Sequence, residues 1–310
     1  MNHVAIIGAG LAGLSAARRL QAAGCAVTVL EKSRSLAGRC ATRLWNGHIV
    51  DHGAQYFTMR VPAFSAEMER VCGDSIRRIE APILTERGAV LPERTPRYYH
   101  VKGNNFLGRT LGEGLDVRKD TTVESVTSVD GKWRVGDELY DQVLITAPWP
   151  QTAKLLGSLS EVCDFAPNLT AFFSYAMPWE GMAREVYAQS FADDDLSWSS
   201  CENHKLNRIQ PGSVVFVAQA GLEFSRQWLE AEPAEWAAIL QNTLELRWKL
   251  DPAARSGQFT HRWRFARVIE PVEKPELPRG LFVAGDAFTE SRVESAWLSG
   301  FEAAEQMLRS

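Results

Sequence analysis

The chain has 310 residues, of which 45% are hydrophobic and 23% charged, a composition typical of a globular protein with one or two cores. A net charge of −4 and a pI of about 5.9 argue against a nucleic-acid-binding or anionic-membrane-binding surface. No apolar run approaches the roughly 18 residues of a membrane span. The five cysteines are scattered and form no CxxC pair, so we expect reduced thiols in a cytoplasmic protein, with neither a disulfide framework nor a metal site.

The first predicted unit is a strand, a glycine turn and a helix. An apolar run at residues 3–7 is followed by GAGLAGL at Gly8–Leu14 and then by a helical pattern. In this arrangement, backbone N–H groups and the helix N-terminus can hold a pyrophosphate. The sequence therefore predicts a dinucleotide site at the glycine turn.

A second strand is predicted at residues 26–30, and it ends in Glu31. A carboxylate at this place can accept hydrogen bonds from the hydroxyls of an adenosine ribose. In the loop that follows, Gly38 lets the backbone approach a diphosphate. Arg39 offers a planar fork that suits phosphate oxygens or the edge of a bound ring.

The segment at residues 50–57 reads VDHGAQYF. Gly53 and Ala54 leave room for a flat ring to approach the main chain, and Gln55 and Tyr56 can border it. The adjacent Asp51 and His52 are not expected to act as a catalytic pair, because neighbours in an extended segment point to opposite faces. We interpret His52 as structural.

The middle of the chain alternates between segments typical of a cofactor-binding domain and aromatic-rich segments typical of a β-sheet domain. A hairpin is predicted within residues 121–145, with its turn at Asp130-Gly131, and a buried strand at 142–146 ends in Ala147-Pro148. Strands are expected at 170–177, 213–220 and 259–267, with helix around 224–250. This pattern predicts two interleaved domains, namely a cofactor domain of residues 1–58, 98–160 and 268–310 and a substrate domain of residues 59–97 and 161–267.

The strand at residues 260–266 has period two. His261, Trp263 and Phe265 are predicted on one face, and Arg262 and Arg264 on the other. The aromatic face can form the floor of a pocket for an aromatic substrate. It can equally be the interior of a packed sheet with one hydrogen-bonded histidine.

A second cofactor motif lies near the C-terminus. A buried strand at residues 281–284 runs into Gly285-Asp286, where a carboxylate can accept hydrogen bonds from ribityl hydroxyls. A terminal helix is predicted at 293–308, and its N-terminus can stabilise negative charge on a reduced flavin. An extended flavin dinucleotide needs contacts at both ends, so the two motifs favour FAD over NAD. The last cysteine is Cys201, far before Gly285, and we therefore predict non-covalent FAD.

Together these residues resemble the flavin-containing amine oxidase superfamily and, within it, the bacterial renalase-like proteins. The resemblance extends along nearly the whole chain in the same order. The matching segments are GAGLAGLSAA with VLEKS, AGR at Ala37–Arg39, DHGAQYFT at Asp51–Thr58, TAP at Thr146–Pro148, HRWRFA at His261–Ala266, and AGD followed by RVESAWLSG at Arg292–Gly300. The segment Gly103–Gly108 departs from the methionine-containing segment of the family, which leaves the substrate open.

The resemblance implies an α/β fold in which a Rossmann-like FAD-binding domain is interleaved with a substrate domain of a β-sheet plus helices. Tyr56, His261 and Trp263 are then expected in the catalytic site. The residues expected to bind FAD are Gly8, Ala9, Gly10, Leu11, Ala12, Gly13, Glu31, Lys32, Gly38, Arg39, Gly53, Ala54, Gln55, Val123, Ala147, Pro148, Gly285, Asp286, Arg292, Val293, Glu294 and Ser295.

The same resemblance implies oxidation of isomeric dihydronicotinamide dinucleotides to NAD(P)⁺, with O₂ as acceptor and H₂O₂ as product. Hydride loss from a dihydronicotinamide needs alignment over the flavin and no strong base, which agrees with the lack of an acid–base pair in the sequence. Oxidation of a small amine is the alternative. Desaturases of porphyrinogens or carotenoids and a non-catalytic FAD-binding protein are further alternatives.

Overall fold

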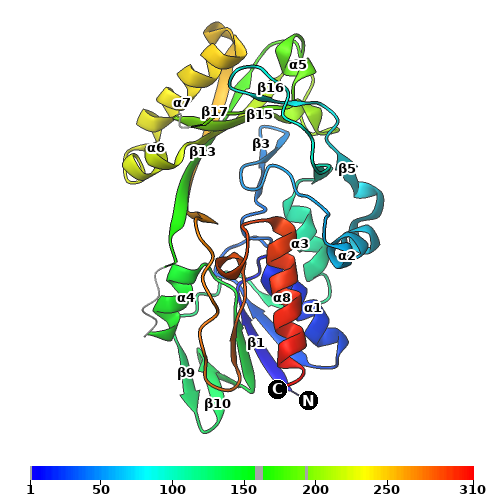
Figure 1. The fold of residues 1–310 in the computed structure, drawn as a ribbon, viewed down its shortest axis with the longest axis vertical. Helices are drawn as coiled ribbons and strands as arrows, with labels where there is room; N and C mark the ends of the chain where they lie inside the picture. The colour runs from blue at the N-terminus through cyan, green and yellow to red at the C-terminus, as the bar shows by residue number, and fades with distance from the viewer. Residues whose placement is uncertain (1, 158–162, 193–194) are drawn as a thin grey trace.

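The computed structural model describes residues 2–157, 163–192 and 195–310. The molecule is elongated and has two main β-sheets, one near each end of its long axis (Figure 1). The two chain termini lie close together beside the lower sheet (Figure 1). The chain passes between the two sheets several times, so neither half of the molecule is one continuous segment.

The lower sheet is parallel and has the strand order β18-β12-β1-β2-β8. Its central strands are almost fully buried, which explains why they appear in the sequence as continuous apolar runs. Its strands are β1 (His3–Ile7), β2 (Ala26–Leu30), β8 (Asp116–Arg118), β12 (Gln142–Ile145) and β18 (Leu281–Val283).

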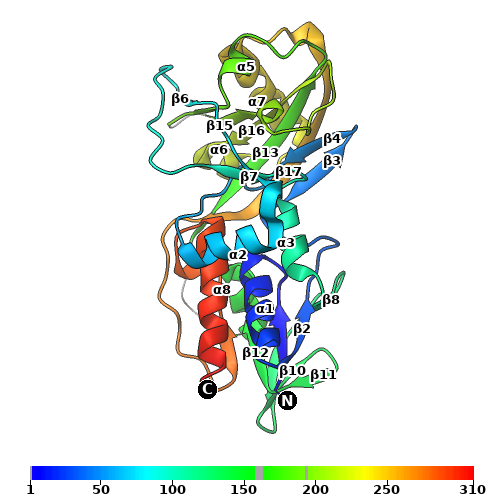
Figure 2. The same cartoon turned by 90° about the vertical axis from the view of Figure 1, so that its right-hand side faces the viewer.

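One face of this sheet is covered by a group of packed helices (Figure 2). They are α1 (Leu11–Ala22), α2 (Pro62–Cys72), α3 (Asn105–Gly112) and α8 (Val293–Met307). The helices α1 and α8 approach so closely that a Cβ on Gly300 would lie 1.9 Å from the carbonyl oxygen of Ala12. This contact brings the last helix of the chain against the first.

The opposite face carries a small antiparallel sheet and one helix. These elements are β9 (Val126–Val129), β10 (Lys132–Val135), β11 (Glu138–Tyr140) and α4 (Trp149–Leu156). The predicted hairpin is confirmed, because Lys132 pairs with Val129 across the turn at Asp130-Gly131. Both turn residues have positive φ, 48° and 78°, as the sharpest hairpin turns require.

The upper sheet has the order β17-β13-β16-β15-β14-β6 and is antiparallel except for the pair β14–β6. Its strands are β6 (Ile83–Thr85), β13 (Phe165–Tyr175), β14 (Ala188–Ser190), β15 (Leu196–Cys201), β16 (Val214–Ala220) and β17 (Arg255–Val268). Helices cover its outer face, namely α5 (Met182–Glu185), α6 (Leu222–Gln227) and α7 (Pro233–Trp248) (Figure 2).

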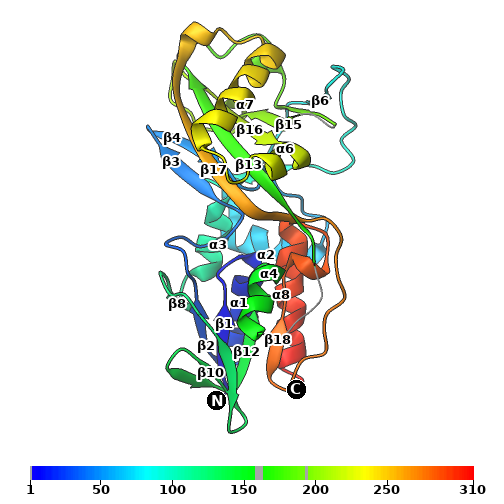
Figure 3. The same ribbon diagram turned by 90° about the vertical axis from the view of Figure 1, so that its left-hand side faces the viewer.

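The inner face of the upper sheet is turned towards the lower half of the molecule. The hairpin of β3 (Thr42–Trp45) and β4 (His48–Asp51) lies beside β13 and β17 there (Figure 3). A second small pair, β5 (Ile76–Arg78) with β7 (Tyr98–His100), connects the two halves at another edge. Segments from both halves of the molecule therefore meet at the inner face of the upper sheet.

The packing of α2 bears on one segment of the proposed domain division. The sequence interpretation placed residues 59–97 with the substrate sheet, but Phe64 and Met68 of α2 are fully buried in the same core as α1 and α8. The reason is the amphipathic spacing of these two side chains, which suits a helix layer better than a sheet edge. The boundary expected at residues 160–161 lies outside the described residues. The rest of the division stays a proposal.

Candidate FAD and substrate site

The glycine turn between β1 and α1 has the geometry of a phosphate-binding loop. Gly8 has φ = 106°, and a Cβ on Gly13 would lie 2.0 Å from the carbonyl oxygen of Gly8, so only glycine fits at Gly13. Gly10, in contrast, has open space where its Cβ would be. In the described part of the chain no side chain caps the N-terminus of α1. Its free N–H groups and the open side of Gly10 suit an anion.

Glu31 orders this turn as well as ending β2. Its carboxylate is buried and accepts hydrogen bonds from the backbone N–H groups of Ala9 and Ser33, both at 2.7 Å. A carboxylate has about four acceptor positions, so Glu31 can still accept from a ribose hydroxyl. Glu31 can therefore contact the ribose as predicted and also hold the backbone of the glycine turn, a role that the sequence analysis did not include.

Arg39 and Asp286 are 247 positions apart in the chain and form a bidentate ion pair, with N···O distances of 2.7 and 2.6 Å. Asp286 also accepts from the hydroxyl of Ser291 at 2.8 Å. Arg39 in addition donates to the carbonyl oxygen of Ala266 at 3.1 Å. The pair joins the loop after β2, the end of β17 and the segment after β18. All three converge where the sequence analysis expects the ribityl chain and the flavin edge.

The segment at residues 53–55 is held tightly against the loop at Arg39. A Cβ on Gly53 would lie 2.0 Å from the carbonyl oxygen of Arg39, and the N–H of Ala54 donates to that oxygen at 2.9 Å. Gln55 is buried, and its side chain donates to the carbonyl oxygen of Asp51 and accepts from the hydroxyl of Ser200 at 2.9 Å. The amide of Gln55 therefore orders the loop, and a contact with a bound ring would come mainly from the backbone.

His52, His261 and Trp263 form one cluster of rings on the inner face of the upper sheet. The ring centroids of His261 and Trp263 are 4.2 Å apart, and His52 lies 5.0 Å from His261 and stacks on Trp263 at 5.7 Å. The indole N–H of Trp263 donates to the carbonyl oxygen of His52 at 2.9 Å. Asp51 points away, into a buried ionic cluster, where it accepts a hydrogen bond from Lys205.

The predicted three-residue aromatic face is wrong at Phe265. The pairing of β17 with β13 is irregular after Trp263, and the ring of Phe265 packs against Phe165 at 5.9 Å in the core below. A bulge of this kind re-aims the side chains that follow it. The opposite face is as expected, because Arg262 and Arg264 bond to Ala231 and Glu230 on the side of the helices.

Both histidines of the cluster are held in the neutral form at pH 7. Burial, together with neighbouring His261, lowers the pKa of His52 to about 4. Burial and the positive charge of Arg43 also lower the pKa of His261. The Nδ1 atom of His52 is buried and has no hydrogen-bond partner within the described residues. The cluster thus offers neutral ring nitrogens and one unused polar atom to a ligand.

A row of side chains on four neighbouring strands extends this cluster across the sheet. His261 pairs with Thr170, Thr170 with Gln219, and Gln219 with Trp198. Tyr56 packs against Trp198, with ring centroids 5.8 Å apart. Strands lie about 4.8 Å apart, so Trp198 lies roughly 14 Å from His261. Tyr56 is therefore at the other end of the same face and not in one cluster with His261 and Trp263.

Three comparisons with known proteins agree with this architecture. Residues 6–71 match the family model of the NAD(P)-binding Rossmann-like domain. A protein from Exiguobacterium sp. 255-15 with a provisional assignment as a protoporphyrinogen oxidase superposes with a TM-score of 0.82 and 17% identity, over 100% of this chain and 99% of the other. For cyclohexylamine oxidase from Brevibacterium oxydans IH-35A the TM-score is 0.76, with 12% identity and 99% of both chains covered.

The chain has the amine oxidase-type flavoprotein fold. Among curated proteins, phytoene desaturase of Fusarium fujikuroi is 36% identical over 97 residues, which is 31% of this chain and 15% of the desaturase. The chain thus spans about a seventh of the length of that relative. The expected fold class is confirmed, and FAD is the cofactor expected of this fold.

Several other residues predicted to bind FAD in this flavoprotein fold are engaged with the protein itself. The buried carboxylate of Glu294 accepts from the hydroxyl of Thr58 and from the backbone N–H groups of Arg60 and Val61, at 2.6 and 3.0 Å. A contact of Glu294 with a flavin would therefore come from its backbone. Lys32 donates to the side chain of Gln151 at 3.0 Å.

The remaining predicted residues border the same region. Arg292 is the residue before α8 and forms an ion pair with Glu290 at 2.8 Å. The side chains of Val123 and Ala147 pack at the edge of the core below the sheet, and Pro148 precedes α4. Gly285 has φ = 131°, and its N–H donates to the hydroxyl of Ser299 at 3.0 Å. Their direct contacts with FAD stay a prediction.

A buried ionic cluster near the site was not predicted. Asp51, Glu202, Lys205 and Arg208 all have side chains with 0% exposure. Lys205 contacts Asp51 at 3.0 Å and Glu202 at 2.6 Å. Burial alone would raise the pKa of Asp51, but the charges of Arg208 and Lys205 and a hydrogen bond from Thr42 bring it well below its ordinary value. No pattern in the sequence around Asp51 or Lys205 indicated that these charges would be buried.

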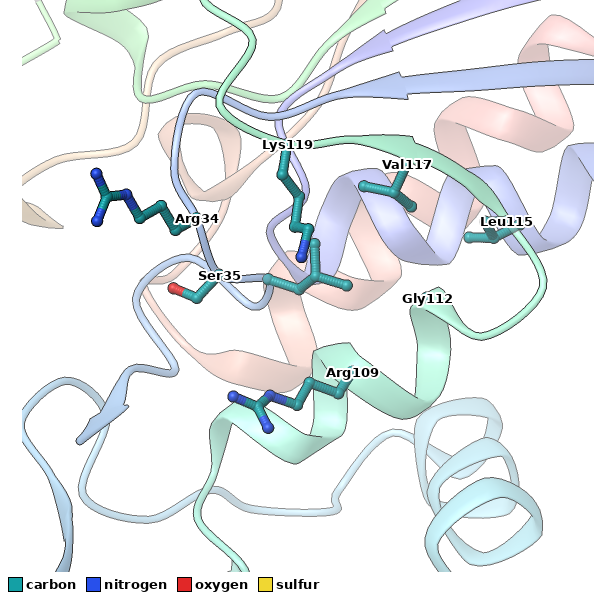
Figure 4. Close-up of a pocket in the computed structure, with 8 residues that line it drawn as sticks. Arg34, Ser35, Arg109, Gly112, Leu115, Val117 and Lys119 are labelled. Carbon is teal, nitrogen blue, oxygen red and sulfur yellow. The ribbon is translucent and has the colours of Figure 1, made fainter. Parts of the chain in front are cut away.

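A separate hollow of about 420 Å³ lies at the edge of the lower sheet. Its side chains come from the loop after β2, from α3 and from β8 and its ends (Figure 4). It is lined by Arg34, Ser35, Leu36, Arg109, Gly112, Leu115, Val117 and Lys119, none of which was predicted to bind FAD. Within the described ranges no helix is both long and apolar enough to cross a bilayer.

Proposed function

We propose that this protein is an FAD-dependent oxidase that converts isomeric dihydronicotinamide dinucleotides to NAD(P)⁺, in the manner of the renalase-like proteins. The observation that carries the proposal is the neutral ring cluster of His52, His261 and Trp263 on the inner face of the upper sheet. A flat dihydropyridine fits against such rings. The five free cysteines agree with a cytoplasmic location.

The reaction balances without a strong base in the protein. The dihydronicotinamide loses a hydride, that is two electrons and one proton, and becomes an aromatic cation. O₂ gains the two electrons and two protons, one of them from solvent, and leaves as H₂O₂. FAD, when bound, supplies the ring that takes the hydride and passes the electrons on. The protein has to align the substrate and keep water away.

The residues of this chain supply the alignment. Trp263 presents an indole face whose orientation is fixed by the hydrogen bond to the carbonyl oxygen of His52. His261 is neutral and can donate or accept a hydrogen bond to a carboxamide, and Nδ1 of His52 is a second polar atom without a partner among the described residues. Arg39 and Asp286, which form an ion pair with each other, would contact FAD when it is bound.

Oxidation of a small amine is the second candidate, because cyclohexylamine oxidase shares the fold. An amine oxidase binds its substrate as the neutral amine in an apolar cage. The positive charge of Arg43, which lowers the pKa of His261, would in the same way favour the neutral form of a bound amine. Because the site therefore suits both candidates, an experiment has to separate them. A third candidate, a non-catalytic FAD-binding protein, predicts a flavin that no small molecule reduces.

We predict that His261→Ala and Trp263→Ala each slow anaerobic flavin reduction by a dihydronicotinamide by roughly 10- to 100-fold, because a small loss of alignment is costly in a hydride transfer. Reoxidation of the reduced flavin by O₂ should change little. The measurement is stopped-flow bleaching of the flavin absorbance with 1,2-, 1,4- and 1,6-dihydronicotinamide dinucleotides and with a panel of amines.

Two further variants sharpen this test. Trp263→Phe keeps an aromatic face but loses the hydrogen bond to His52, so its rate should lie between those of wild type and Trp263→Ala. His3→Ala removes a histidine that packs on Tyr140 in the lower half, 4.5 Å between centroids, and serves as the control. Wild-type rates in both alanine variants at the cluster would assign those rings to a structural interior. Bleaching by amines alone would replace the proposed activity with the second candidate.

A further inference from the structure

Arg43 is a cation at the outer edge of the ring cluster. It lies on β3, and its guanidinium carbon is 4.2 Å from the centroid of the Phe259 ring. Phe259 in turn packs against His52, with centroids 5.7 Å apart. Arg43 itself is exposed, and no carboxylate among residues 2–157, 163–192 and 195–310 forms an ion pair with it. It is therefore held in place by stacking and its donors remain available.

Two arginines on β17 differ from Arg43 in having acidic partners. On β17, Arg255 forms an ion pair with Glu245, and Arg264 with Glu230. The acidic residue closest in sequence to the cluster, Asp51, is already neutralised by Lys205 and Arg208. The charge of Arg43 is thus not compensated locally, and its effect on the pKa values of both histidines shows that its field reaches the cluster.

A second observation points to a ligand at the same place. His52 is only 8% exposed, and its Nδ1 atom has no hydrogen-bond partner within the described residues. A buried polar atom without a partner is costly, and a bound group or a water would supply the partner that His52 lacks. The ring cluster, the His52 nitrogen and Arg43 are thus connected through the ring of Phe259, which contacts both His52 and Arg43.

We propose that Arg43 binds the phosphate nearest the nicotinamide end of the substrate and so selects anionic over neutral or cationic substrates. This inference rests on the function proposed above and deepens it. A guanidinium can bond a phosphate through two parallel N–H groups, and its stacking on Phe259 pre-orders that fork. An ammonium substrate, in contrast, meets a like charge at the rim.

The test compares three dihydronicotinamide probes that share the nicotinamide riboside, namely the riboside itself, the mononucleotide, which adds one phosphate, and the dinucleotide, which adds a second phosphate and adenosine. In the holoenzyme, Arg43→Gln should raise the concentration for half-maximal anaerobic flavin reduction by roughly 3- to 5-fold for the two phosphate-bearing probes, the upper end of what an exposed charged pair supplies. The value for the riboside should shift less than twofold. Arg43→Lys keeps the charge without the fork and should lie between wild type and Arg43→Gln.

The matched control is Arg184→Gln. Arg184 is an exposed arginine on α5 whose guanidinium carbon lies 5.9 Å from the Trp179 ring, so the variant has the same change of net charge and loses a similar stacking contact. Its response to all three probes should equal that of wild type. Equal shifts for riboside and dinucleotide in Arg43→Gln would overturn the phosphate assignment, as would no shift for any probe.

A binding measurement separates this inference from the proposed function. Calorimetric titration of the FAD-loaded protein with inorganic pyrophosphate should show binding that Arg43→Gln weakens and Arg184→Gln does not. If no dihydronicotinamide bleaches the wild-type flavin, the proposed function fails, while this titration still decides whether Arg43 is an anion site. Binding that is lost in Arg109→Gln instead would place the anion in the hollow beside α3 and overturn the inference.

Discussion

The Asp286→Ala variant is expected to bind FAD roughly 10- to 150-fold more weakly than wild type, which corresponds to a lost charged hydrogen bond of about 1.5–3 kcal/mol. The carboxylate of Asp286 is buried and is contacted by Arg39 and Ser291. Its removal takes away acceptors predicted for the ribityl hydroxyls and also leaves the guanidinium of Arg39 without its acidic partner. The measurement is a titration of the deflavinated protein with FAD, in which the quenching of flavin fluorescence reports binding.

Two variants decide by which of these routes Asp286 acts. If the carboxylate contacts the ribityl chain directly, Asp286→Ala should weaken binding even when Arg39 is already replaced by alanine. If it acts only by positioning Arg39, the double variant should be no weaker than Arg39→Ala alone. Asp164→Ala is the control, because it removes an exposed carboxylate paired with Arg226. Full flavin occupancy of Asp286→Ala after dilution and dialysis would refute the assignment.

The fold of the lower half could be predicted because local sequence signals decide it. A glycine turn between an apolar strand and an amphipathic helix has few other interpretations, and the strand ending in Glu31 follows the same rule. The same holds for the hairpin at Asp130-Gly131. In each case, the residues that determine the structure lie within about ten positions of one another.

The substrate site could be predicted only in part because it depends on pairing between distant strands. His261 and Trp263 were found from period two, but the bulge that redirects Phe265 is set by the partner strand β13. Likewise, Trp198 lies on the same face as His261 through two intermediate strands, and nothing near Trp198 in the sequence indicates this register. Register between non-adjacent strands is a tertiary property.

The buried ionic cluster could not be predicted either, because it too depends on residues that are distant in the sequence. Asp51 and Lys205 are 154 positions apart, and an isolated charged residue is usually exposed, so burial of these charges could not be expected from either sequence neighbourhood. Burial becomes possible only because Arg208, Lys205, Glu202 and Asp51 meet in one place. Their position, between β4 and the segment at residues 202–208, connects the loop that borders the predicted flavin site to the substrate sheet.

Asp51→Asn is expected to lower the free energy of unfolding by about 3–5 kcal/mol, because it leaves two buried cations with a single carboxylate between them. Asp51 also accepts hydrogen bonds from the hydroxyl of Thr42 at 2.6 Å and the backbone N–H of Asn104 at 2.9 Å. The amide of asparagine keeps the shape and one acceptor but loses the charge. Urea unfolding followed by circular dichroism measures the change, with Asp116→Asn, at an exposed ion pair with Arg118, as the control.

The pH dependence of the same variant gives an independent check. The pKa of Asp51 is well below its ordinary value in the folded protein, so its contribution to stability is fully present above about pH 4, the unfolded pKa, and is lost as the pH falls further. Wild type should therefore lose stability more steeply than Asp51→Asn below that pH. The double variant Asp51→Asn with Lys205→Met should recover part of the loss, because it removes one unpaired cation. Strict additivity of the two substitutions, or a control-sized effect of Asp51→Asn, would show that Asp51 and Lys205 are not energetically coupled.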